Sequence, residues 1–417
     1  MRILHVVHGY PPSTGGSQWL TKNLSEQLVS RYRDAVTVFT TVAYNTEYFW
    51  RSNEPAMPAG TEEINGVTVR RFAVFNRLNV LRMLIAGVAH RLRLPYNDML
   101  RTVYNGPLIF GMTQAVANSK ADIVFATAFP LMHMYYALAG ARRAGIPIVF
   151  LGAIHTADTW GYDRKMIYRA IQQADAYIAL TGFERDYLIG RGIQVDKISV
   201  IGAGVDANVF VKADGAAIRR RYGWGDAPVV ALVAKQAARK RSDVLLEAMR
   251  QVWAAYPDAR LLIAGAQTPY SRLIQRTIGA LPPEQNAHVT VVSDFLEEEK
   301  PNLLAACDIF ALPSGYESFG IAFVEAWACG KPVIGTRTGA IPSVIDEDHD
   351  GLLVTYQDAD DLARAILELL ATPQRRAQMG EAGRRKVWEN YTWEVVADQV
   401  RRVYVEAIAR HAGRGGM

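Results

Sequence analysis

The stretch at residues 312–341, LPSGYESFGIAFVEAWACGKPVIGTRTGAI, constrains the fold of this chain more than any other part of it. The apolar run just before it, at 309–312, is short and stops at Pro313, which is typical of a buried parallel strand. Apolar residues then recur at helical spacing from Ala322 to Trp327, and Gly330 ends the helix. A helix N-terminus at the carboxyl end of a parallel strand presents unpaired N–H groups and a partial positive charge. The stretch therefore predicts a phosphate-binding site.

Short apolar runs alternate with helical segments along the whole chain, which indicates an α/β protein with doubly wound parallel sheets. Because 417 residues exceed one ordinary core, we expect two domains. Residues 43–65 have no clear periodicity and are expected to form an excursion or a mobile flap. Strands are expected at residues 3–7, 36–40, 67–72, 123–126, 148–151, 176–180 and 198–201, and in the second half at 229–233, 260–264, 288–292, 309–312, 333–335 and 352–354.

Two acids frame the predicted helix N-terminus. Glu317 lies in the loop before the helix, and Glu325 lies five residues past Gly320, about 7–8 Å along the helix axis. With a diphosphate on the terminus, a carboxylate at that distance is placed to accept hydrogen bonds from two ribose hydroxyls. The plainer interpretation makes Glu317 a capping charge and Glu325 a solvated surface acid. The small residues around both acids favour the functional interpretation.

Two cations follow the expected strand at 229–233. Lys235 and Lys240 precede a helix that starts near Ser242, so they lie where the carboxyl ends of parallel strands face an anion. They would neutralise a leaving diphosphate by positioned charge, without a metal. Their neighbours Arg239 and Arg241 are able to share that role. The alternative is a solvated basic loop.

Two features of the first half are candidates for ligand contact. Gly15 and Gly16 connect the first strand to the first helix, where backbone without side chains allows a phosphate or sugar to approach, although many such turns contain glycine. They do not form a Gly-x-Gly-x-x-Gly motif, which argues against a nicotinamide dehydrogenase. His155 follows the apolar run at 146–154 and therefore lies at the carboxyl end of a strand. A lone histidine is more often structural than catalytic, so its role stays open at this point.

The residues Glu317-Ser-Phe-Gly and Glu325-Ala, followed by Ala-Cys-Gly-Lys-Pro-Val-Ile-Gly and Thr338-Gly-Ala-Ile-Pro, resemble the nucleotide-sugar site of family 4 glycosyltransferases. The resemblance extends over nearly the whole chain. It implies the GT-B fold, in which two Rossmann-like domains face a cleft. It also implies an acceptor-binding domain at 1–205, a connection at 206–226, a donor-binding domain at 227–392 and a last helix, 393–417, that crosses back to the first domain.

The resemblance also implies roles for individual residues. Lys235, Lys240, Glu317 and His155 would be catalytic: the lysines stabilise the departing phosphate, Glu317 orients the donor sugar, and His155 contacts that sugar from the first domain. Lys235 stands where the family more often has arginine, which keeps the charge but loses the two-pronged geometry. The implied donor-binding residues are Gly15, Gly16, Ser318, Phe319, Gly320, Ile321 and Glu325.

The predicted function is transfer of a hexose from a nucleotide diphosphate sugar to an acceptor hydroxyl with retention of anomeric configuration. A UDP-sugar is favoured and GDP-mannose comes next, while the acceptor is open and includes a lipid-linked or cell-envelope saccharide. Retention and the absence of a metal cofactor follow from the resemblance. Two alternatives remain: a nucleotide-sugar epimerase of the same fold, for which no first-domain acid set is evident, and a non-catalytic nucleotide-sugar binder. No feature points to nucleic acid.

Composition and local motifs limit the cellular context. Two cysteines give neither a disulfide framework nor metal-ligand spacing, and no apolar run reaches the roughly 20 residues of a membrane span. The N-terminus lacks the length and cleavage site of a signal peptide, so a cytoplasmic protein is expected. Residues 346–351, DEDHDG, resemble a calcium loop, but Gln357 occupies the position that requires glutamate. We interpret this segment as a solvated acidic turn without a metal.

The charge of the chain is unevenly distributed. Between Arg70 and Lys120 there are eight basic residues and one acid, Asp98. Within this span an apolar stripe recurs at helical spacing, with Arg82 and Arg93 on one flank. One interpretation is a helix that docks on the anionic inner face of a membrane through residues 70–101. The other is an ordinary helix that buries its stripe against the first domain. The stripe consists of Leu78, Leu81, Ile85, Val88 and Leu92.

Overall fold

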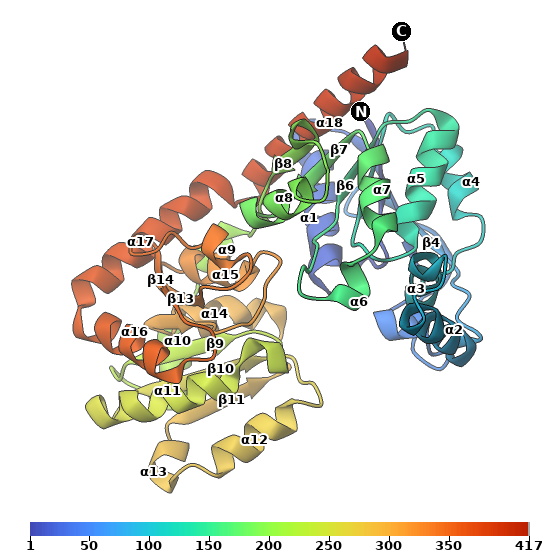
Figure 1. The fold of residues 1–417 in the computed structure, drawn as a ribbon. Helices are drawn as coiled ribbons and strands as arrows, with labels where there is room; N and C mark the ends of the chain where they lie inside the picture. Colours follow the sequence, from blue (N-terminus) through green and yellow to red (C-terminus); the bar gives the residue numbers. More distant parts are fainter. Residues whose placement is uncertain (416–417) are drawn as a thin grey trace. The chain divides into compact units, whose positions relative to one another are not determined.

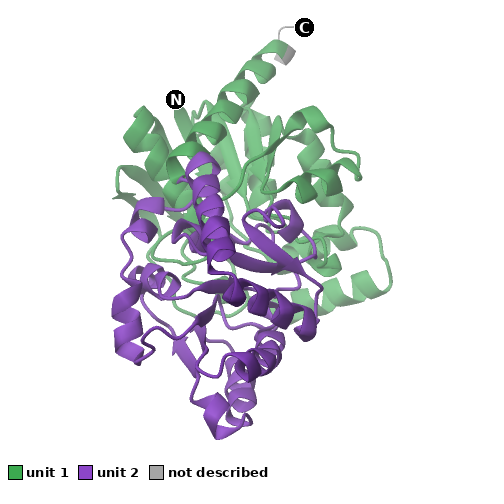
Figure 2. Ribbon diagram, turned by 90° about the vertical axis from the view of Figure 1, so that its left-hand side faces the viewer, with its two compact units in different colours: residues 1–203, 393–417 green, residues 204–392 purple. Residues whose placement is uncertain are grey.

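The computed structural model describes residues 1–415 and divides into two compact units (Figure 2). Unit 1 contains residues 1–203 together with the last helix, α18 (Trp393–Gly415), and unit 2 contains residues 204–392. The segment at 206–226, expected as a connection, forms two helices that pack within unit 2. Among the described residues, no helix is both long enough and apolar enough to span a lipid bilayer.

Unit 1 is built on an eight-stranded sheet, counted over the described residues, with the order β3-β4-β2-β1-β5-β6-β7-β8. The chain leaves β1 toward β2 on one side and returns to β5 on the other, so the sheet is doubly wound as predicted. The strands are β1 (Arg2–Val6), β2 (Ala35–Thr41), β3 (Gly60–Ile64), β4 (Val67–Phe72), β5 (Ile123–Thr127), β6 (Ile148–Leu151), β7 (Ala176–Ala179) and β8 (Ile198–Val200).

The expectation for residues 43–65 was wrong in one respect, because it omitted strand β3. This edge strand pairs antiparallel with β4, so the sheet is mixed. Its sequence, GTEEI, is exposed along nearly its whole length and therefore carries no apolar alternation that would reveal it. The residues before it are anchored rather than free, since Phe49 is buried in the core and Trp50 Nε1 donates to Tyr104 O at 2.8 Å.

The helices of unit 1 flank the sheet (Figure 1). The last helix packs on α1, where Arg401 Nε lies 2.9 Å from Asp34 Oδ2 and Tyr404 Oη lies 3.1 Å from His5 Nε2. The remaining helices are α1 (Gly16–Tyr32), α2 (Asn79–Arg91), α3 (Asn97–Asn105), α4 (Met112–Ala117), α5 (His133–Ala144), α6 (Thr159–Tyr162), α7 (Lys165–Gln173) and α8 (Gly182–Ile189), with 3-10 turns at Thr46–Phe49 and Val195–Lys197.

The helix predicted from the stripe at residues 78–92 exists as α2, but the stripe is not buried. Its five apolar residues are all exposed. Three arginines counted with the basic span are not exposed: Arg71 and Arg101 are buried, and Arg82 is half-buried. Arg82 donates to Phe49 O and Val103 O, and Arg101 is buried and donates to Trp160 O at 2.9 Å. The interpretation of α2 as an ordinary buried helix is therefore wrong, and so is the placement of Arg82 among surface charges.

Unit 2 is built on a six-stranded sheet with the order β11-β10-β9-β12-β13-β14, again counted over residues 1–415. All neighbouring strands are parallel, and the chain reverses direction across the sheet between β9 and β12. The strands are apolar and mostly buried on both faces, as a covered parallel sheet requires. They are β9 (Val229–Val233), β10 (Arg260–Gly265), β11 (Val289–Ser293), β12 (Ile309–Ala311), β13 (Val333–Thr336) and β14 (Gly351–Val354).

Close helix packing in unit 2 depends on glycine. A side chain at Gly383 would place its Cβ 2.0 Å from the ring of the buried Trp327, so the helix carrying Gly383 lies close to the one carrying Trp327. The helices are α9 (Ala207–Val211), α10 (Gly215–Tyr222), α11 (Ser242–Ala255), α12 (Ser271–Gly279), α13 (Pro283–Asn286), α14 (Lys300–Ala305), α15 (Ile321–Ala328), α16 (Ala359–Ala371) and α17 (Pro373–Asn390), with 3-10 turns at Ala238–Lys240, Glu297–Glu299 and Ile341–Ser343.

Candidate active site

The phosphate-binding feature predicted from the sequence is the N-terminus of α15. The helix begins at Ile321, directly after the loop that follows β12, and Gly320 is its N-cap. Gly320 has φ +91°, and a Cβ there would lie 2.6 Å from the ring of Phe323, so only glycine fits. No side chain caps this terminus, and the first turn carries no acid. Its N–H groups therefore suit an anionic ligand.

The predicted cation loop lies beside this terminus because β9 and β12 are neighbours in the sheet. Ser314 Oγ and Gly315 N both donate to Arg239 O, which joins the two loops. Lys240 Nζ donates to Glu317 Oε1 at 2.6 Å, and each of these side chains is 9% exposed. Arg239 lies 3.8 Å from the other oxygen of Glu317. The structure thus brings together three of the charged residues singled out in the sequence.

Burial lowers the pKa of Lys240, while the nearby Glu317 carboxylate raises it and limits the shift. A lysine in this position is weakly solvated and so interacts strongly with a phosphate oxygen. The pair also explains why two charges tolerate a buried site, since each neutralises the other.

Glu325 is almost completely buried in α15 and is therefore not the solvated surface acid of the plainer interpretation. Its Oε1 accepts a hydrogen bond from Lys300 Nζ at 2.8 Å, and Lys300 also contacts Glu297. Burial raises the pKa of Glu325, and Lys300 opposes this effect. For Lys300, burial lowers the pKa, but the two carboxylates outweigh it and the net shift is upward.

Lys300 is a residue that the sequence analysis missed. It lies at the first position of α14, 25 positions before its partner, and no motif spacing links it to Glu325. A weak signal exists in the sequence: Lys300 directly follows three glutamates, Glu297–Glu299, in front of an apolar run that reads as a helix. That context is typical of a surface charge, so only the structure identifies the pair.

The remaining unit 2 candidates differ in their environment. Lys235 follows β9 as predicted and is exposed, and within the described part of the chain its side chain makes no ion pair. Arg241 forms a two-pronged pair with Asp243 and so does not share the role of Lys240. Ser318 and Ile321 are half-buried beside Gly320. Phe319 is buried with its ring 5.3 Å from that of Tyr391, so its observed contact is internal packing.

In unit 1, Gly15 is the N-cap of α1 and Gly16 its first residue. Gly15 has φ +154°, and a Cβ there would lie 2.5 Å from Gln18 Oε1, whereas a Cβ at Gly16 would meet nothing within 4 Å. The 17-residue helix has no side-chain cap and no acid in its first turn. This terminus leaves room at Gly16 for the close approach of a phosphate or sugar, and such a contact stays a prediction.

His155 lies in the loop after β6, at the carboxyl end of the strand, as the sequence predicted. It is half-buried, with its ring 5.5 Å from that of Tyr162. The buried Glu184 fixes this loop, because its carboxylate accepts a hydrogen bond from Ile154 N at 3.0 Å. The same carboxylate accepts hydrogen bonds from Leu180 N at 2.8 Å and Tyr177 Oη at 2.6 Å. Burial raises the pKa of Glu184, an effect that these donors oppose.

Three other histidines of unit 1 are buried near the strands. Burial lowers the pKa of His5 and of His8 to about 3 and that of His133 to about 4. His133 Nε2 donates to Thr127 O at 2.7 Å, and the rings of His8 and His133 are 5.8 Å apart. These residues are neutral near pH 7, and their buried positions assign them to the core.

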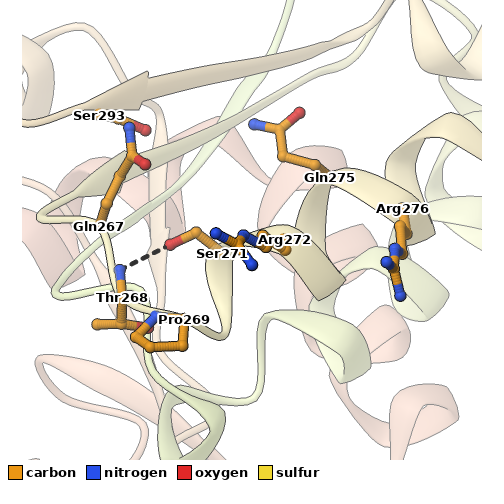
Figure 3. A pocket seen from close by; sticks show the side chains of 8 residues that line it. All are labelled: Gln267, Thr268, Pro269, Ser271, Arg272, Gln275, Arg276 and Ser293. Atoms are coloured by element: carbon orange, nitrogen blue, oxygen red, sulfur yellow. Dashed lines mark hydrogen bonds between the residues drawn. The ribbon is translucent and has the colours of Figure 1, made fainter.

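A cavity of about 680 Å³ opens at the carboxyl ends of β10 and β11, beside the N-terminus of α12 (Figure 3). It adjoins the cation loop because Gln236 Nε2 donates to Ser293 Oγ at 3.0 Å and Thr268 Oγ1 donates to Gln236 O. The sequence analysis did not single out this region. The lining residues are Gln267, Thr268, Pro269, Ser271, Arg272, Gln275, Arg276 and Ser293.

The acidic turn at 346–351 is less solvated than predicted. The side chain of Asp350 is fully buried, and Lys386 Nζ of α17 lies 2.7 Å from Asp350 Oδ2 and 2.8 Å from Asp346 Oδ2. The turn therefore fastens α17 to the start of β14. No group of three or more His, Cys, Asp or Glu side chains within residues 1–415 is arranged to hold a metal ion.

The chain folds into two doubly wound α/β units, and in unit 2 paired charges surround a helix N-terminus where the strand order reverses. This is the fold of the GT-B class of glycosyltransferases. Solved structures agree on the fold. HepE from Anabaena in complex with UDP has a TM-score of 0.72 at 18% identity, covering 97% of this chain and 100% of that one. Sucrose-phosphate synthase from Thermosynechococcus elongatus has a TM-score of 0.72 at 21% identity, covering 98% and 100%.

Sequence comparisons identify the family. The family described as Glycosyltransferase Family 4 matches residues 14–209, and Glycosyl transferases group 1 matches residues 215–386. A GDP-mannose-dependent alpha-(1-6)-phosphatidylinositol monomannoside mannosyltransferase from Mycolicibacterium smegmatis is 31% identical over 61% of this chain and 69% of its own length. The chain belongs to the family 4 glycosyltransferases.

Two further relatives differ in how much of their length is matched. The GDP-mannose-dependent monoacylated alpha-(1-6)-phosphatidylinositol monomannoside mannosyltransferase from Corynebacterium glutamicum is 37% identical over 48% of this chain and 53% of its own length. The D-inositol 3-phosphate glycosyltransferase from Saccharomonospora viridis is 27% identical over 98% of this chain and 94% of its own length. The second of these alignments spans nearly the whole length of both chains and therefore includes both units.

Proposed function

We propose that this enzyme transfers a hexose from a nucleotide diphosphate sugar to a hydroxyl of an inositol-containing acceptor, with retention of anomeric configuration. The observation that carries the proposal is the pair of lysine–glutamate contacts around the α15 N-terminus, Lys240–Glu317 and Lys300–Glu325. They place two cations and two carboxylates beside a helix N-terminus that no side chain caps. A sugar nucleotide carries the complementary groups: a diphosphate, a ribose diol and a sugar.

The reaction requires stabilisation of the negative charge that develops on the leaving diphosphate. The α15 terminus binds the diphosphate, and Lys240, aided by Lys235 and Arg239, stabilises it as the glycosidic bond breaks. Glu325 accepts hydrogen bonds from the ribose hydroxyls, and Glu317 orients the sugar. The leaving phosphate oxygen takes the proton of the attacking acceptor hydroxyl, so no separate base and no metal enter the proposal. His155, Gly15 and Gly16 are proposed as further sugar and donor contacts.

For the donor base, we place GDP-mannose first and a UDP-sugar second. The sequence alone favoured UDP, but the relatives from Corynebacterium glutamicum and Mycolicibacterium smegmatis are GDP-mannose-dependent by name. The cavity at the ends of β10 and β11 is large enough for a base and offers amide and guanidinium side chains for hydrogen bonding, such as Gln267, Arg272 and Gln275. Its connection to the cation loop through Gln236 supports this use.

For the acceptor, the names of the relatives point to two forms of one chemistry. Some act on phosphatidylinositol mannosides and others on D-inositol 3-phosphate. Both present secondary hydroxyls on or near an inositol that carries a phosphate. We favour the lipid-linked form, and with it a cytoplasmic enzyme that works at the inner face of the membrane.

The test is a matrix of donors and acceptors. GDP-mannose, UDP-glucose and ADP-glucose are each combined with phosphatidylinositol monomannoside or inositol 3-phosphate, and nucleotide release and product are followed by mass spectrometry. The proposal expects acceptor-dependent release of nucleotide with one donor, and an α-linked product by NMR. Release of an epimerised free sugar would support the epimerase alternative instead. Donor binding without turnover on any acceptor would support a non-catalytic binder.

A further inference from the structure

Helix α2 turns its large apolar side chains to solvent and its small ones inward. Ala86 and Ala89 are its buried residues, whereas six larger apolar residues within the helix are all at least 45% exposed. Helices of globular proteins ordinarily show the opposite arrangement. The six exposed residues are Val80, Leu81, Met83, Leu84, Ile85 and Val88.

The inward face explains why α2 holds this orientation. Arg82 of α2 donates to two backbone carbonyls of other segments of unit 1, Phe49 O at 3.0 Å and Val103 O at 3.4 Å. The ring of His90 packs edge-on against Trp160 with centroids 4.8 Å apart. Turning the apolar face inward would break these contacts, so the exposure is a property of the folded unit.

The exposed apolar surface continues beyond α2. Leu78 and Leu92 extend it at the two ends of the helix, and Leu94 and Tyr96 extend it into the turn before α3. Helix α3 packs against α2 along the outer side of unit 1 (Figure 1) and adds Met99. A single exposed leucine needs no explanation, but a run of this kind marks an interaction site.

Along residues 77–99, which form this surface, the fully exposed charges have one sign. Arg77, Arg91 and Arg93 are exposed, one before the helix and two at its end. The single acid between residues 70 and 120, Asp98, pairs with the buried Arg101 at 2.8 Å and is therefore neutralised. A partner for this surface must thus offer an apolar region to the aliphatic side chains and anionic groups to the arginines. A bilayer with anionic headgroups has this character over the full area.

We propose that the exposed face of α2, with its continuation to Met99, is a docking surface for an anionic lipid bilayer; it is named here the α2 face. In this arrangement the aliphatic side chains enter the interface between headgroups and acyl chains, and the three arginines contact the headgroup phosphates. The proposal deepens the proposed function by naming where the enzyme would meet a lipid-linked acceptor. It rests on that function only for the identity of the acceptor.

The test measures binding of the full chain to vesicles. Vesicles of equal parts phosphatidylglycerol and phosphatidylcholine are compared with vesicles of phosphatidylcholine alone, at about 0.05 M and about 0.5 M salt, where screening differs strongly. The wild type should co-sediment with the anionic vesicles at low salt and bind several-fold more weakly at high salt. Binding to phosphatidylcholine alone should be weak at both.

Two variants separate the apolar and charged parts of the surface. The double variant Leu84→Gln with Val88→Gln should weaken binding to anionic vesicles at least tenfold, because two aliphatic side chains no longer enter the bilayer. Arg91→Gln with Arg93→Gln should remove most of the salt dependence. Both pairs change exposed residues, so folding should be preserved and is checked by circular dichroism.

Matched controls carry the same substitutions elsewhere. Val209→Gln with Val405→Gln changes two valines that are 47% and 48% exposed outside the α2 face. Arg143→Gln with Arg402→Gln changes two exposed arginines of unit 1. Both controls should bind vesicles like the wild type.

Three results would overturn the proposal: no binding of the wild type to anionic vesicles, variants that bind as well as the wild type, or a wild-type dimer that the Leu84/Val88 variant converts to a monomer without any vesicle binding. The last result would assign the α2 face to a second copy of the chain. Transfer to water-soluble inositol 3-phosphate is measured in parallel and should be unchanged in the Leu84/Val88 variant. Vesicle binding without any transfer would reject the proposed function and leave the docking surface standing.

Discussion

At the scale of single residues, the site is organised by two acids that each share a hydrogen bond with a lysine. Both glutamates lie within or beside α15, and both lysines come from other segments of the same sheet edge. A carboxylate this buried requires a charged partner, because an unpaired charge in such a position is strongly unfavourable. Each carboxylate therefore has a cation within hydrogen-bond distance, which offsets part of the cost of burying its charge.

Removing either carboxylate should affect different steps. Glu325→Gln should weaken donor binding, because ribose contacts act in the ground state, whereas Glu317→Gln should lower turnover with little change in donor affinity. The loss of a charged hydrogen bond is worth about 1.5–3 kcal/mol, or roughly 10- to 150-fold. Calorimetry and steady-state kinetics with saturating and subsaturating donor measure the two effects. Wild-type values for both variants would show that the site lies elsewhere.

Lys300 should prove necessary for both stability and donor binding. Lys300→Gln leaves the buried Glu325 without its cation, which should reduce the free energy of unfolding by about 3 kcal/mol or less and raise the KM for the donor. Lys212→Gln, which changes an exposed lysine of the same unit, is the control and should behave like the wild type. Urea denaturation and kinetics are the measurements. An unchanged KM would mean that the pair is structural only.

At the scale of elements, most strands were predictable because they are short apolar runs buried on both faces. Residues 67–72, 148–151 and 229–233 coincide with β4, β6 and β9. Edge strand β3 was missed because its side chains face solvent and carry no burial pattern. Helix α2 was predicted correctly as a helix, while the side that its apolar stripe faces was left open. An apolar stripe indicates one face of a helix, but it does not say whether protein or solvent covers that face. The contacts of Arg82 with the rest of unit 1 fix which side of α2 faces inward.

The candidate site was predictable where the sequence carries local geometry. Gly320 and Glu325 lie at the start of one helix and within it, and the alternation of strands and helices places that helix N-terminus and Lys240 each at the carboxyl end of a parallel strand. That the two strands are neighbours is known only from the structure. Lys300 and the cavity at β10 and β11 could not be predicted, because each depends on side chains brought together from distant positions without a fixed spacing.

The α15 N-terminus should tolerate no side chain at Gly320. Gly320→Ala combines φ +91° with a Cβ 2.6 Å from Phe323, so it should lower the free energy of unfolding by about 2–4 kcal/mol and reduce donor affinity. Gly330→Ala is the matched control at the other end of the helix, since its φ is +67° but its Cβ meets nothing within 4 Å. It should cost about 1 kcal/mol. Equal losses in both variants, measured by urea denaturation, would contradict the argument.

Unit 1 should lose stability in mild acid. The buried histidines remain neutral in the folded state down to a pKa of about 3–4, whereas in the unfolded chain they bind protons below pH about 6.5. The unfolded state therefore binds more protons throughout this window, and stability present above pH 6.5 falls as the pH decreases. At pH 5, His133 alone should contribute about 2 kcal/mol to this loss.

The measurement is the free energy of unfolding against pH. His133→Gln should flatten the decline between pH 6.5 and pH 4, and His349→Gln, at an exposed position, should leave it unchanged. A wild-type curve without any decline over this window would show that these histidines gain protons without unfolding.

At the scale of the whole molecule, each unit contributes a distinct chemical surface. Unit 2 carries the paired charges that suit a sugar nucleotide, and unit 1 carries the α2 face together with His155 and the Gly15–Gly16 terminus. We propose that lysine side chains of unit 2, rather than a metal ion, stabilise the departing diphosphate.

The most direct test of that claim is the rate of acceptor-dependent GDP release from GDP-mannose in excess EDTA, for the wild type and for Lys240→Gln. If the donor screen selects another sugar nucleotide, that donor replaces GDP-mannose. We expect EDTA to leave the wild-type rate unchanged and Lys240→Gln to lower it by about 100-fold, because a preorganised charge at the leaving group is lost. Loss of the wild-type activity in EDTA with recovery on adding magnesium or manganese, or a wild-type rate for Lys240→Gln, would contradict the claim.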